Sequence, residues 1–343
     1  MTLRVAAIGP EGFGVYALEG ARLTPSSGEP EAILTPGFFD IHIHGGNGID
    51  VMDASSAEIV RLCEYLADQG YEAFLPTTVT APVDAVNRVL ATLPNHDMIA
   101  GIHLEGPFIS PQHPGAQPTE WIIPTPGPES AWNAVLDDPR LRVITLAPEL
   151  AGACELIARL AGRGVRIGMG HTGATFAQAE AGFLAGATHT THTFNAMRGF
   201  HHREAGIAGF ALTEKGIACE LIYDRLHVCS DAARILVQAK PVDKLIAVSD
   251  GTAASGLPRG THLSMWRHDA MVGNGDVRLA DGTLAGSAIT LLDAFQNLAA
   301  DFGVEAAIRA TSLNPRKLLG LTEPPRVHLL FDLKFGLLER RIS

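Results

Sequence analysis

A (β/α)8 barrel with a small β-rich appendage is the fold that this sequence predicts, and three observations lead to it. From residue 36 onward, short apolar runs of β-like composition alternate with amphipathic stretches, a rhythm typical of parallel sheets. Eight such runs can be traced, which is the strand number of a closed barrel. No G-x-G-x-x-G or P-loop motif follows the first run, and its absence disfavours an open nucleotide-binding sheet.

The elements follow one another in a β-then-α order. The first predicted strand, 38–44, ends at a Gly-Gly pair, and a helix follows from about residue 56 behind the capping-box residues Ser55 and Glu58. The later predicted strands are 73–77, 99–105, 143–147, 165–170, 187–192, 217–223 and 245–250. The later predicted helices are 83–93, 129–137, 151–162, 175–185, 230–239, 287–301, 304–311 and 314–319. We therefore expect the barrel at 36–321, and a reduced appendage from 1–35 with 322–343.

Composition argues against several classes of function. The net charge of −11 disfavours a general nucleic-acid or anionic-membrane surface. The first residues lack the apolar core of a signal peptide, and no apolar run approaches the length of a membrane span. The four cysteines form no C-x-x-C pair, so reduced thiols are expected. The sequence thus predicts a cytoplasmic protein with no nucleic-acid or membrane partner.

Ligand-type side chains occur where five of the predicted strands end. Parallel strands of a barrel present their carboxyl ends at one rim, where barrel enzymes carry their chemistry. His42 and His44 lie two residues apart on a strand and therefore share a face. The full set is His42, His44, Glu105, His171, His192 and Asp250. Imidazoles and carboxylates together suit a divalent metal, so a TIM-like metallohydrolase barrel is expected.

Each of these residues also has a plainer interpretation when taken alone. An isolated His-x-His pair is as consistent with ordinary core histidines, and Asp250 before Gly251 is turn chemistry. His103 and His189 are expected to be structural. The five lysines all lie after residue 214, so a metal-bridging carbamylated lysine is disfavoured and Glu105 becomes the candidate bridging carboxylate.

The motifs in this chain resemble those of a known family. In chain order they are P-G-F-x-D-x-H-x-H-G, H-L-E-G-P-F, G-H-T-x-A, T-H-x-F-N-A-M, R-E-x-G, L-H-V and V-S-D-G. They span about residues 34 to 320 and are similar to those of the N-acetylglucosamine-6-phosphate deacetylases of the amidohydrolase superfamily. Many relatives have a histidine where this chain has Gln117.

This resemblance implies a role for each matching residue. Glu105, His171 and His192 would be the primary metal ligands, and His42 with His44 would hold a second metal. Asp250 would be the catalytic acid/base. The implied substrate-binding residues are Gln117, Asn195, Ala196, Arg203, His227, Leu284, Ala285 and Gly286. A homodimer is implied, with Arg203, His227 or both contributed to the phosphate across the interface. An insertion of about 30 residues before Leu284 is a candidate lid.

The expected reaction is hydrolysis of the acetamide of N-acetyl-D-glucosamine 6-phosphate to D-glucosamine 6-phosphate and acetate. One or two divalent metals per chain are expected, zinc first, with iron, manganese and cobalt as alternatives. A metal-bound water would be the nucleophile, and Asp250 would carry its proton to the amine. The alternatives are a related amino-sugar phosphate such as the galactosamine epimer, a deaminase of the same superfamily, and a protein that only binds metal or sugar phosphate.

Overall fold

The computed structural model describes residues 3–266 and 268–342, and it contains an eight-stranded parallel barrel. Its strands hydrogen-bond in chain order, and a parallel bridge between Ile43 and Gly251 connects the first strand to the segment after the last. The barrel strands are β5 (Phe38–Ile43), β8 (Tyr71–Thr78), β9 (Ile102–Glu105), β10 (Leu141–Leu146), β11 (Arg166–Met169), β12 (His189–Thr190), β13 (Ala218–Ile222) and β14 (Leu245–Val248). The predicted fold class is confirmed.

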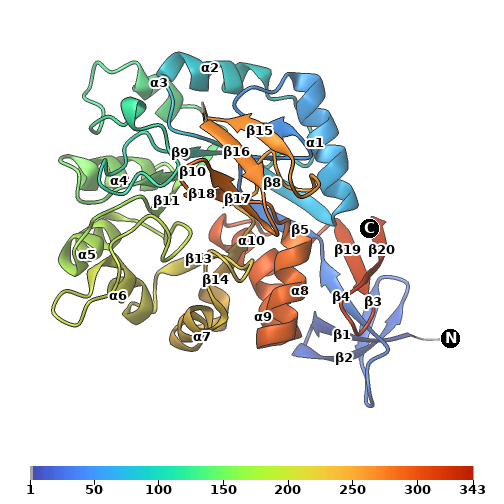
Figure 1. The fold of residues 1–343 in the computed structure, drawn as a ribbon. Helices are drawn as coiled ribbons and strands as arrows, with labels where there is room; N and C mark the ends of the chain where they lie inside the picture. Colours follow the sequence, from blue (N-terminus) through green and yellow to red (C-terminus); the bar gives the residue numbers. More distant parts are fainter. Residues whose placement is uncertain (1–2, 267, 343) are drawn as a thin grey trace.

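Helices surround the barrel (Figure 1). The α-helices are α1 (Ser56–Asp68), α2 (Val83–Thr92), α3 (Trp132–Leu136), α4 (Ala153–Ala161), α5 (Phe176–Ala185), α6 (Gly206–Thr213), α7 (Ser230–Ala239), α8 (Leu291–Phe302), α9 (Val304–Ile308) and α10 (Asn314–Leu318). The short elements are the 3-10 turns η1 (Thr119–Trp121) and η2 (Val242–Lys244) and the π-helical turn η3 (Arg309–Leu313).

Helix α1 was predicted from its amphipathic pattern, whereas helix α6 was missed because it has none. Helix α1 begins at the expected capping box of Ser55 and Glu58 and buries apolar residues at helical spacing. Helix α6 was not predicted, because its residues 206–211 are all buried and give no amphipathic period.

The two ends of the chain form a second, six-stranded sheet. The hydrogen-bonded order is β20 (Leu337–Ile342), β19 (Val327–Phe331), β4 (Ala32–Pro36), β1 (Leu3–Gly9), β2 (Gly12–Glu19) and β3 (Arg22–Pro25). Figure 1 shows it beside the barrel, next to β5 and the helices α8 and α9. A buried ion pair of 2.7 Å between Arg316 and Glu72 lies at the junction, where Glu72 also accepts from the N–H of Val327.

A four-stranded antiparallel sheet, here called the lid sheet (residues 262–287), is inserted between β14 and α8. Its strands are β15 (His262–Met265), β16 (His268–Val272), β17 (Asp276–Leu279) and β18 (Leu284–Ser287). In Figure 1 this orange sheet lies across the barrel. Ser287 donates its N–H to the carbonyl of Asp250 at 2.8 Å, so the last lid strand is joined to the segment that follows β14.

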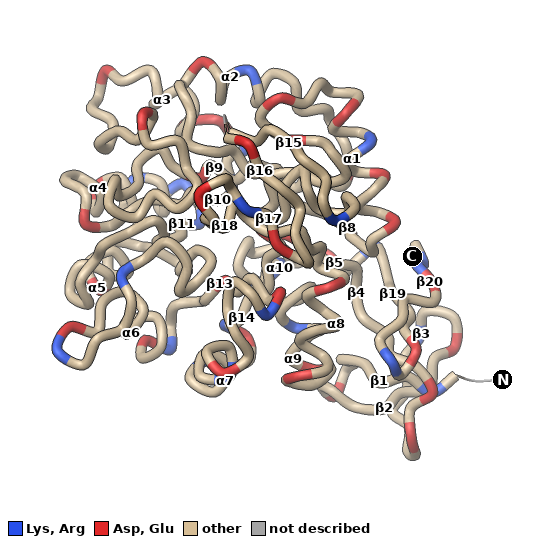
Figure 2. Tube along the Cα trace, viewed as in Figure 1, with Lys and Arg blue, Asp and Glu red and all other residues tan. Residues whose placement is uncertain are grey.

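Acidic and basic positions are interspersed along the chain trace (Figure 2). None of the helices in the described residues combines the length and apolarity needed to cross a membrane.

Candidate metal centre

Strand β5 contains a one-residue bulge at the paired histidines. The pairing of β5 with β8 shifts register between Asp40 and Ile43, so β5 holds one extra residue there. A bulge of this kind re-aims side chains. Ile41 packs in the apolar barrel interior with Leu75. The side chains of His42 and His44 lie above that interior layer, at the carboxyl end of the strand.

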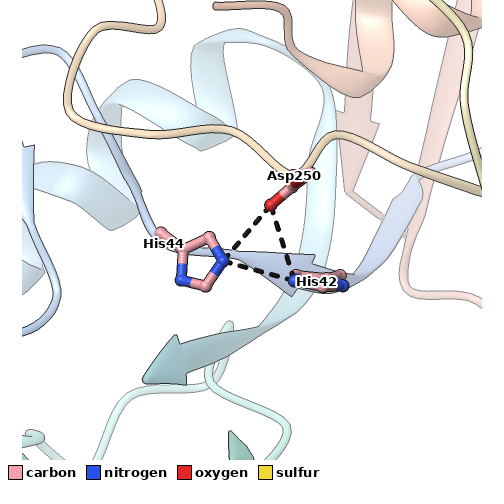
Figure 3. Close-up of side chains that lie close together, drawn as sticks. All are labelled: His42, His44 and Asp250. Atoms are coloured by element: carbon pink, nitrogen blue, oxygen red, sulfur yellow. Dashed lines mark hydrogen bonds and ion pairs between the residues drawn. The ribbon is translucent and has the colours of Figure 1, made fainter. Parts of the chain in front are cut away.

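The six predicted ligands come together as two groups of three, all buried. We call His42, His44 and Asp250 the paired-histidine group, and Glu105, His171 and His192 the glutamate group. In the paired-histidine group the Nε2 atoms of His42 and His44 are 3.2 Å apart. Oδ1 of Asp250 lies 3.5 Å from Nε2 of His42 and 3.2 Å from Nε2 of His44 (Figure 3).

The glutamate group has the same dimensions. Oε1 of Glu105 lies 3.1 Å from Nε2 of His171 and 3.2 Å from Nε2 of His192, and these two nitrogens are 3.1 Å apart. Ligand atoms about 2.0–2.1 Å from a tetrahedral zinc are roughly 3.3 Å from one another. Both groups therefore fit a divalent cation.

Glu105 links the two groups. Its Oε1 lies 3.3 Å from Nε2 of His42, and its Oε2 lies 3.3 Å from Nε2 of His44. One carboxylate thus contacts all four imidazoles, as a carboxylate between two cations would.

Hydrogen bonds on the far side of the ring orient two of the histidines, His44 and His171. Nδ1 of His44 lies 3.2 Å from the carbonyl of Thr77, and Nδ1 of His171 lies 3.1 Å from the carbonyl of His113. A carbonyl can only accept, so each Nδ1 carries the proton. Nε2 is then left as the ligand atom, the usual arrangement in metal sites.

Glu220, in the middle of β13, is a residue that the sequence analysis missed. Its Oε2 lies 3.2 Å from Nδ1 of His42 and accepts the backbone N–H of His192 at 3.0 Å, while its Oε1 lies 3.1 Å from Nε2 of His189. An acidic residue inside an otherwise apolar strand was the available signal, because a buried carboxylate requires partners.

Gln117, predicted to contact the substrate, hydrogen-bonds to Glu105. Its amide nitrogen donates to Oε2 of Glu105 at 2.6 Å, and its amide oxygen accepts the N–H of Thr80 at 2.7 Å. The side chain lines the cavity, and one of its two amide protons is not used by these two hydrogen bonds, so its predicted contact with substrate stays a prediction.

The pKa values of the clustered carboxylates and imidazoles are shifted in the directions that favour a bound positive charge. Burial would raise the pKa of Glu105, but the neighbouring His42 and His171 outweigh it and hold this pKa well below its usual range. Burial would likewise raise the pKa of Asp250, which is lowered instead by His42 and His44. Burial would lower the pKa of His44, but the carboxylates of Asp250 and Glu105 raise it to about 9. Ionised carboxylates in this position favour a cation in place of the protons.

Three of the ligands have strained backbones. The φ angles of His171, His192 and Asp250 are +47°, +27° and +47°, in the left-handed region that residues with side chains seldom adopt. Such strain costs roughly 1–3 kcal/mol per residue and is typical of functional sites. Each of these residues lies in the turn just beyond a barrel strand.

A cavity of 420 Å³ opens above the cluster. Five of the six ligands line it, and the sixth, His42, lies behind them. The predicted substrate residues that line it are Gln117, Asn195, Ala196, His227, Leu284 and Gly286. The lining residues that the sequence analysis did not select are Gly115, Ala116, Trp266, Arg278, Gly282 and Thr283.

Two predicted substrate residues do not line this cavity. Ala285 lies between Leu284 and Gly286 on β18, and because alternate residues of a strand face opposite sides, its side chain packs into the apolar cluster of the lid sheet. Arg203 is exposed on the loop before α6, outside the cavity of its own chain.

The sequence was compared with protein-family models and with curated proteins. Residues 33–324 match the model described as the amidohydrolase family. The N-acetylgalactosamine-6-phosphate deacetylase of Escherichia coli O157:H7 is 36% identical over 298 residues, which are 84% of this chain and 78% of that protein. The N-acetylglucosamine-6-phosphate deacetylase of Bacillus subtilis (strain 168) is 38% identical over 273 residues, 76% of this chain and 68% of that protein.

Solved structures give the same relationship over the whole chain. The N-acetyl-D-glucosamine-6-phosphate deacetylase of Mycobacterium smegmatis superposes with a TM-score of 0.89 at 29% identity, covering 100% of this chain and 98% of that one. A mutant of that enzyme in complex with N-acetyl-D-glucosamine-6-phosphate gives a TM-score of 0.87 at 29% identity, covering 98% and 96% of the two chains.

Proposed function

The chain belongs to the amidohydrolase family, and from that premise we propose that it hydrolyses the acetamide of N-acetyl-D-glucosamine 6-phosphate to D-glucosamine 6-phosphate and acetate. The observation that carries the proposal is the pair of three-ligand groups, joined by Glu105, at the floor of a 420 Å³ cavity. This arrangement provides ligands for a cation and space for a small substrate on the same rim.

One or two divalent cations per chain fit these ligands, and we propose zinc first, with iron, manganese or cobalt accepted by the same ligand types. Such a cation supplies a Lewis acid and a water whose pKa is lowered to about 7. Glu105, His171 and His192 would hold the primary cation, and His42 with His44 and Asp250 a second one.

Asp250 is the proposed proton carrier. Its carboxylate lines the cavity, and because its pKa is lowered it is ionised at neutral pH and can accept a proton from the attacking water. It then returns that proton to the amine nitrogen as the carbon–nitrogen bond breaks. The backbone N–H of Asp250 donates to the carbonyl of His42 at 2.9 Å, which fixes the residue against β5.

Other residues that line the cavity are proposed to bind the sugar phosphate. Oδ2 of Asp224 accepts from Nδ1 of His227 at 2.6 Å and orients this cavity-lining ring, which is a proposed contact of the phosphate. Arg203 is exposed and outside its own cavity, which supports a homodimer in which it reaches the cavity of the partner. The four free cysteines support the proposed cytoplasmic location.

The epimer N-acetyl-D-galactosamine 6-phosphate is a second candidate substrate, because a curated relative at 36% identity is named for it. The two sugars differ only in the configuration at C4, so the acetamide and phosphate contacts proposed here are the same for both.

Acetate release tests the proposal. The purified protein, loaded separately with zinc, iron, manganese or cobalt, is assayed with both sugar phosphates and with unphosphorylated N-acetylglucosamine. We expect the highest kcat/KM with N-acetyl-D-glucosamine 6-phosphate. A higher value for the galactosamine epimer would reassign the substrate, and no acetate from any of the three would refute the proposed function.

A further inference from the structure

The lid sheet contributes one positively charged side chain, Arg278, to the lining of the cavity. Among the described residues that line the cavity, Arg278 on β17 is the only lysine or arginine. It pairs across the sheet with Leu284 on β18, which also lines the cavity. The sequence analysis selected Leu284 and left Arg278 unassigned, because short β-hairpin strands give no indication of which side chains face the barrel.

Charged side chains of both signs line the cavity. Its acidic side chains, Glu105 and Asp250, belong to the two ligand groups, and Arg278 is its one basic side chain among the described lysines and arginines. A phosphate group is repelled from uncompensated carboxylates and attracted to a guanidinium. Of the side chains lining the cavity, Arg278 therefore provides the natural position for an anionic end of a ligand.

The lid sheet also lies against the loop that carries His227. A Cβ atom built on Gly275, in the turn just before β17, would lie 3.8 Å from Cδ1 of Leu226. The turn that leads into Arg278 therefore lies near the residue preceding His227. His227, which also lines the cavity, is already proposed to bind the phosphate.

Two hydrogen bonds hold the guanidinium in place without using all of it. Nε donates to Oδ2 of Asp276 at 2.6 Å, and Nη1 donates to the carbonyl of Gly282 at 2.9 Å. Among the described residues Nη2 has no protein partner, and 49% of the side chain is exposed. Asp276 is itself engaged by the N–H of Asn274 at 3.0 Å, so its charge is shared. A guanidinium oriented in this way retains donors for a phosphate.

From these observations we propose that Arg278 binds the 6-phosphate of the substrate, from the lid sheet of the same chain, and thereby selects phosphorylated over unphosphorylated amino sugars. This inference rests on the proposed function and adds to it a specificity residue within the chain, in contrast to the contribution of Arg203 from a partner. It also connects the phosphate of the substrate to the position of the lid sheet.

Kinetics with two substrates test the inference. In Arg278→Ala we expect kcat/KM for N-acetyl-D-glucosamine 6-phosphate to fall about 10- to 100-fold, the usual effect of losing a charge-assisted hydrogen bond. For unphosphorylated N-acetylglucosamine we expect a change of less than about twofold. Arg278→Lys should restore part of the preference, because a lysine keeps the charge but not the planar fork. Arg259→Ala is the matched control, since this exposed arginine of the same insertion does not line the cavity.

The outcomes separate this inference from the proposed function. If Arg278→Ala lowers kcat/KM equally for both substrates, Arg278 only supports the lid sheet through Asp276, and the inference is wrong. An unchanged preference for the phosphorylated sugar in Arg278→Ala would also overturn it, while the proposed function would stand. If the alanine variant does not fold, Arg278→Gln is titrated with D-glucosamine 6-phosphate by calorimetry against the unaltered protein, and equal Kd values contradict the inference.

Discussion

The two ligand groups have the same dimensions but different surroundings. The glutamate group comes from the ends of β9, β11 and β12, and all three of its members line the cavity. The paired-histidine group reaches deeper, because His42 is fully buried behind the cavity and contacts the carboxylate of Glu220. The two groups therefore differ mainly at His42, since Asp250 and His44 of the paired-histidine group also line the cavity.

The largest effect is expected where the two groups meet. Glu105→Gln removes the charge that all four imidazoles share, so both cations should be lost. Because a cation contributes several kcal/mol to transition-state stabilisation, kcat should fall about a thousandfold or more. Elemental analysis and acetate release measure the two effects. Glu58→Gln, on the exposed first turn of α1, is the control, and a variant that keeps both metals would show that Glu105 does not join the groups.

Asp250→Asn should give the next largest effect. It removes the proposed proton carrier and leaves the glutamate group intact, so we expect kcat to fall about 10²- to 10⁴-fold with at least one metal retained. Near-normal activity with metal bound would contradict the proposed role of Asp250.

Removing only the paired imidazoles sharpens the comparison. The double variant His42→Gln with His44→Asn should bind about one metal per chain and keep more activity than Asp250→Asn, because the glutamate group remains. Metal content and kcat are measured on the same preparation. Complete loss of activity would place the paired-histidine group at the centre of the reaction instead.

Glu220→Gln should weaken the paired-histidine group without abolishing it. The amide keeps an acceptor for His42 and for the N–H of His192 but loses the charge, and changes of this kind typically cost about 10- to 100-fold in metal affinity. Competition with a chelator measures the affinity of each site. Glu72→Gln, which breaks a buried ion pair distant from the site, controls for a general loss of stability. If Glu220→Gln and the unaltered protein bind metal with equal affinity, the charge of Glu220 does not contribute to metal binding.

The smallest effect is expected in the metal-free protein, as a change of its thermal stability with pH. His44 has a folded-state pKa of about 9, above the value of about 6.5 in an unfolded chain, so its contribution is full below pH 6.5 and lost as pH rises through 9. Tm of the stripped protein should therefore decrease between pH 6.5 and 9. Added zinc should abolish this decrease, because a bound imidazole is neutral. A flat profile without metal would contradict the electrostatic description.

The sequence predicted which candidate ligands come together, but not the residues that hold them in place. Glu105, His171 and His192 could be found because chemistry in a barrel is concentrated just beyond the strand ends, and strand positions follow from apolar runs. The bulge in β5 could not be found, because a single inserted residue leaves the composition of the run unchanged. The same holds for Arg278, which belongs to short strands with few core positions.

The attachment of the lid sheet determines how a substrate can enter. Ser287 donates to the carbonyl of Asp250, and Thr252 donates to the carbonyl of Ser287 at 3.2 Å, so β18 is bonded to the backbone on both sides of Gly251. Swinging β18 outward would displace Asp250 itself. Any gate for substrate must therefore pivot beyond β18, about β15, β16 and β17. Amide hydrogen exchange should accordingly be slow at Ser287 and become faster toward Gly275.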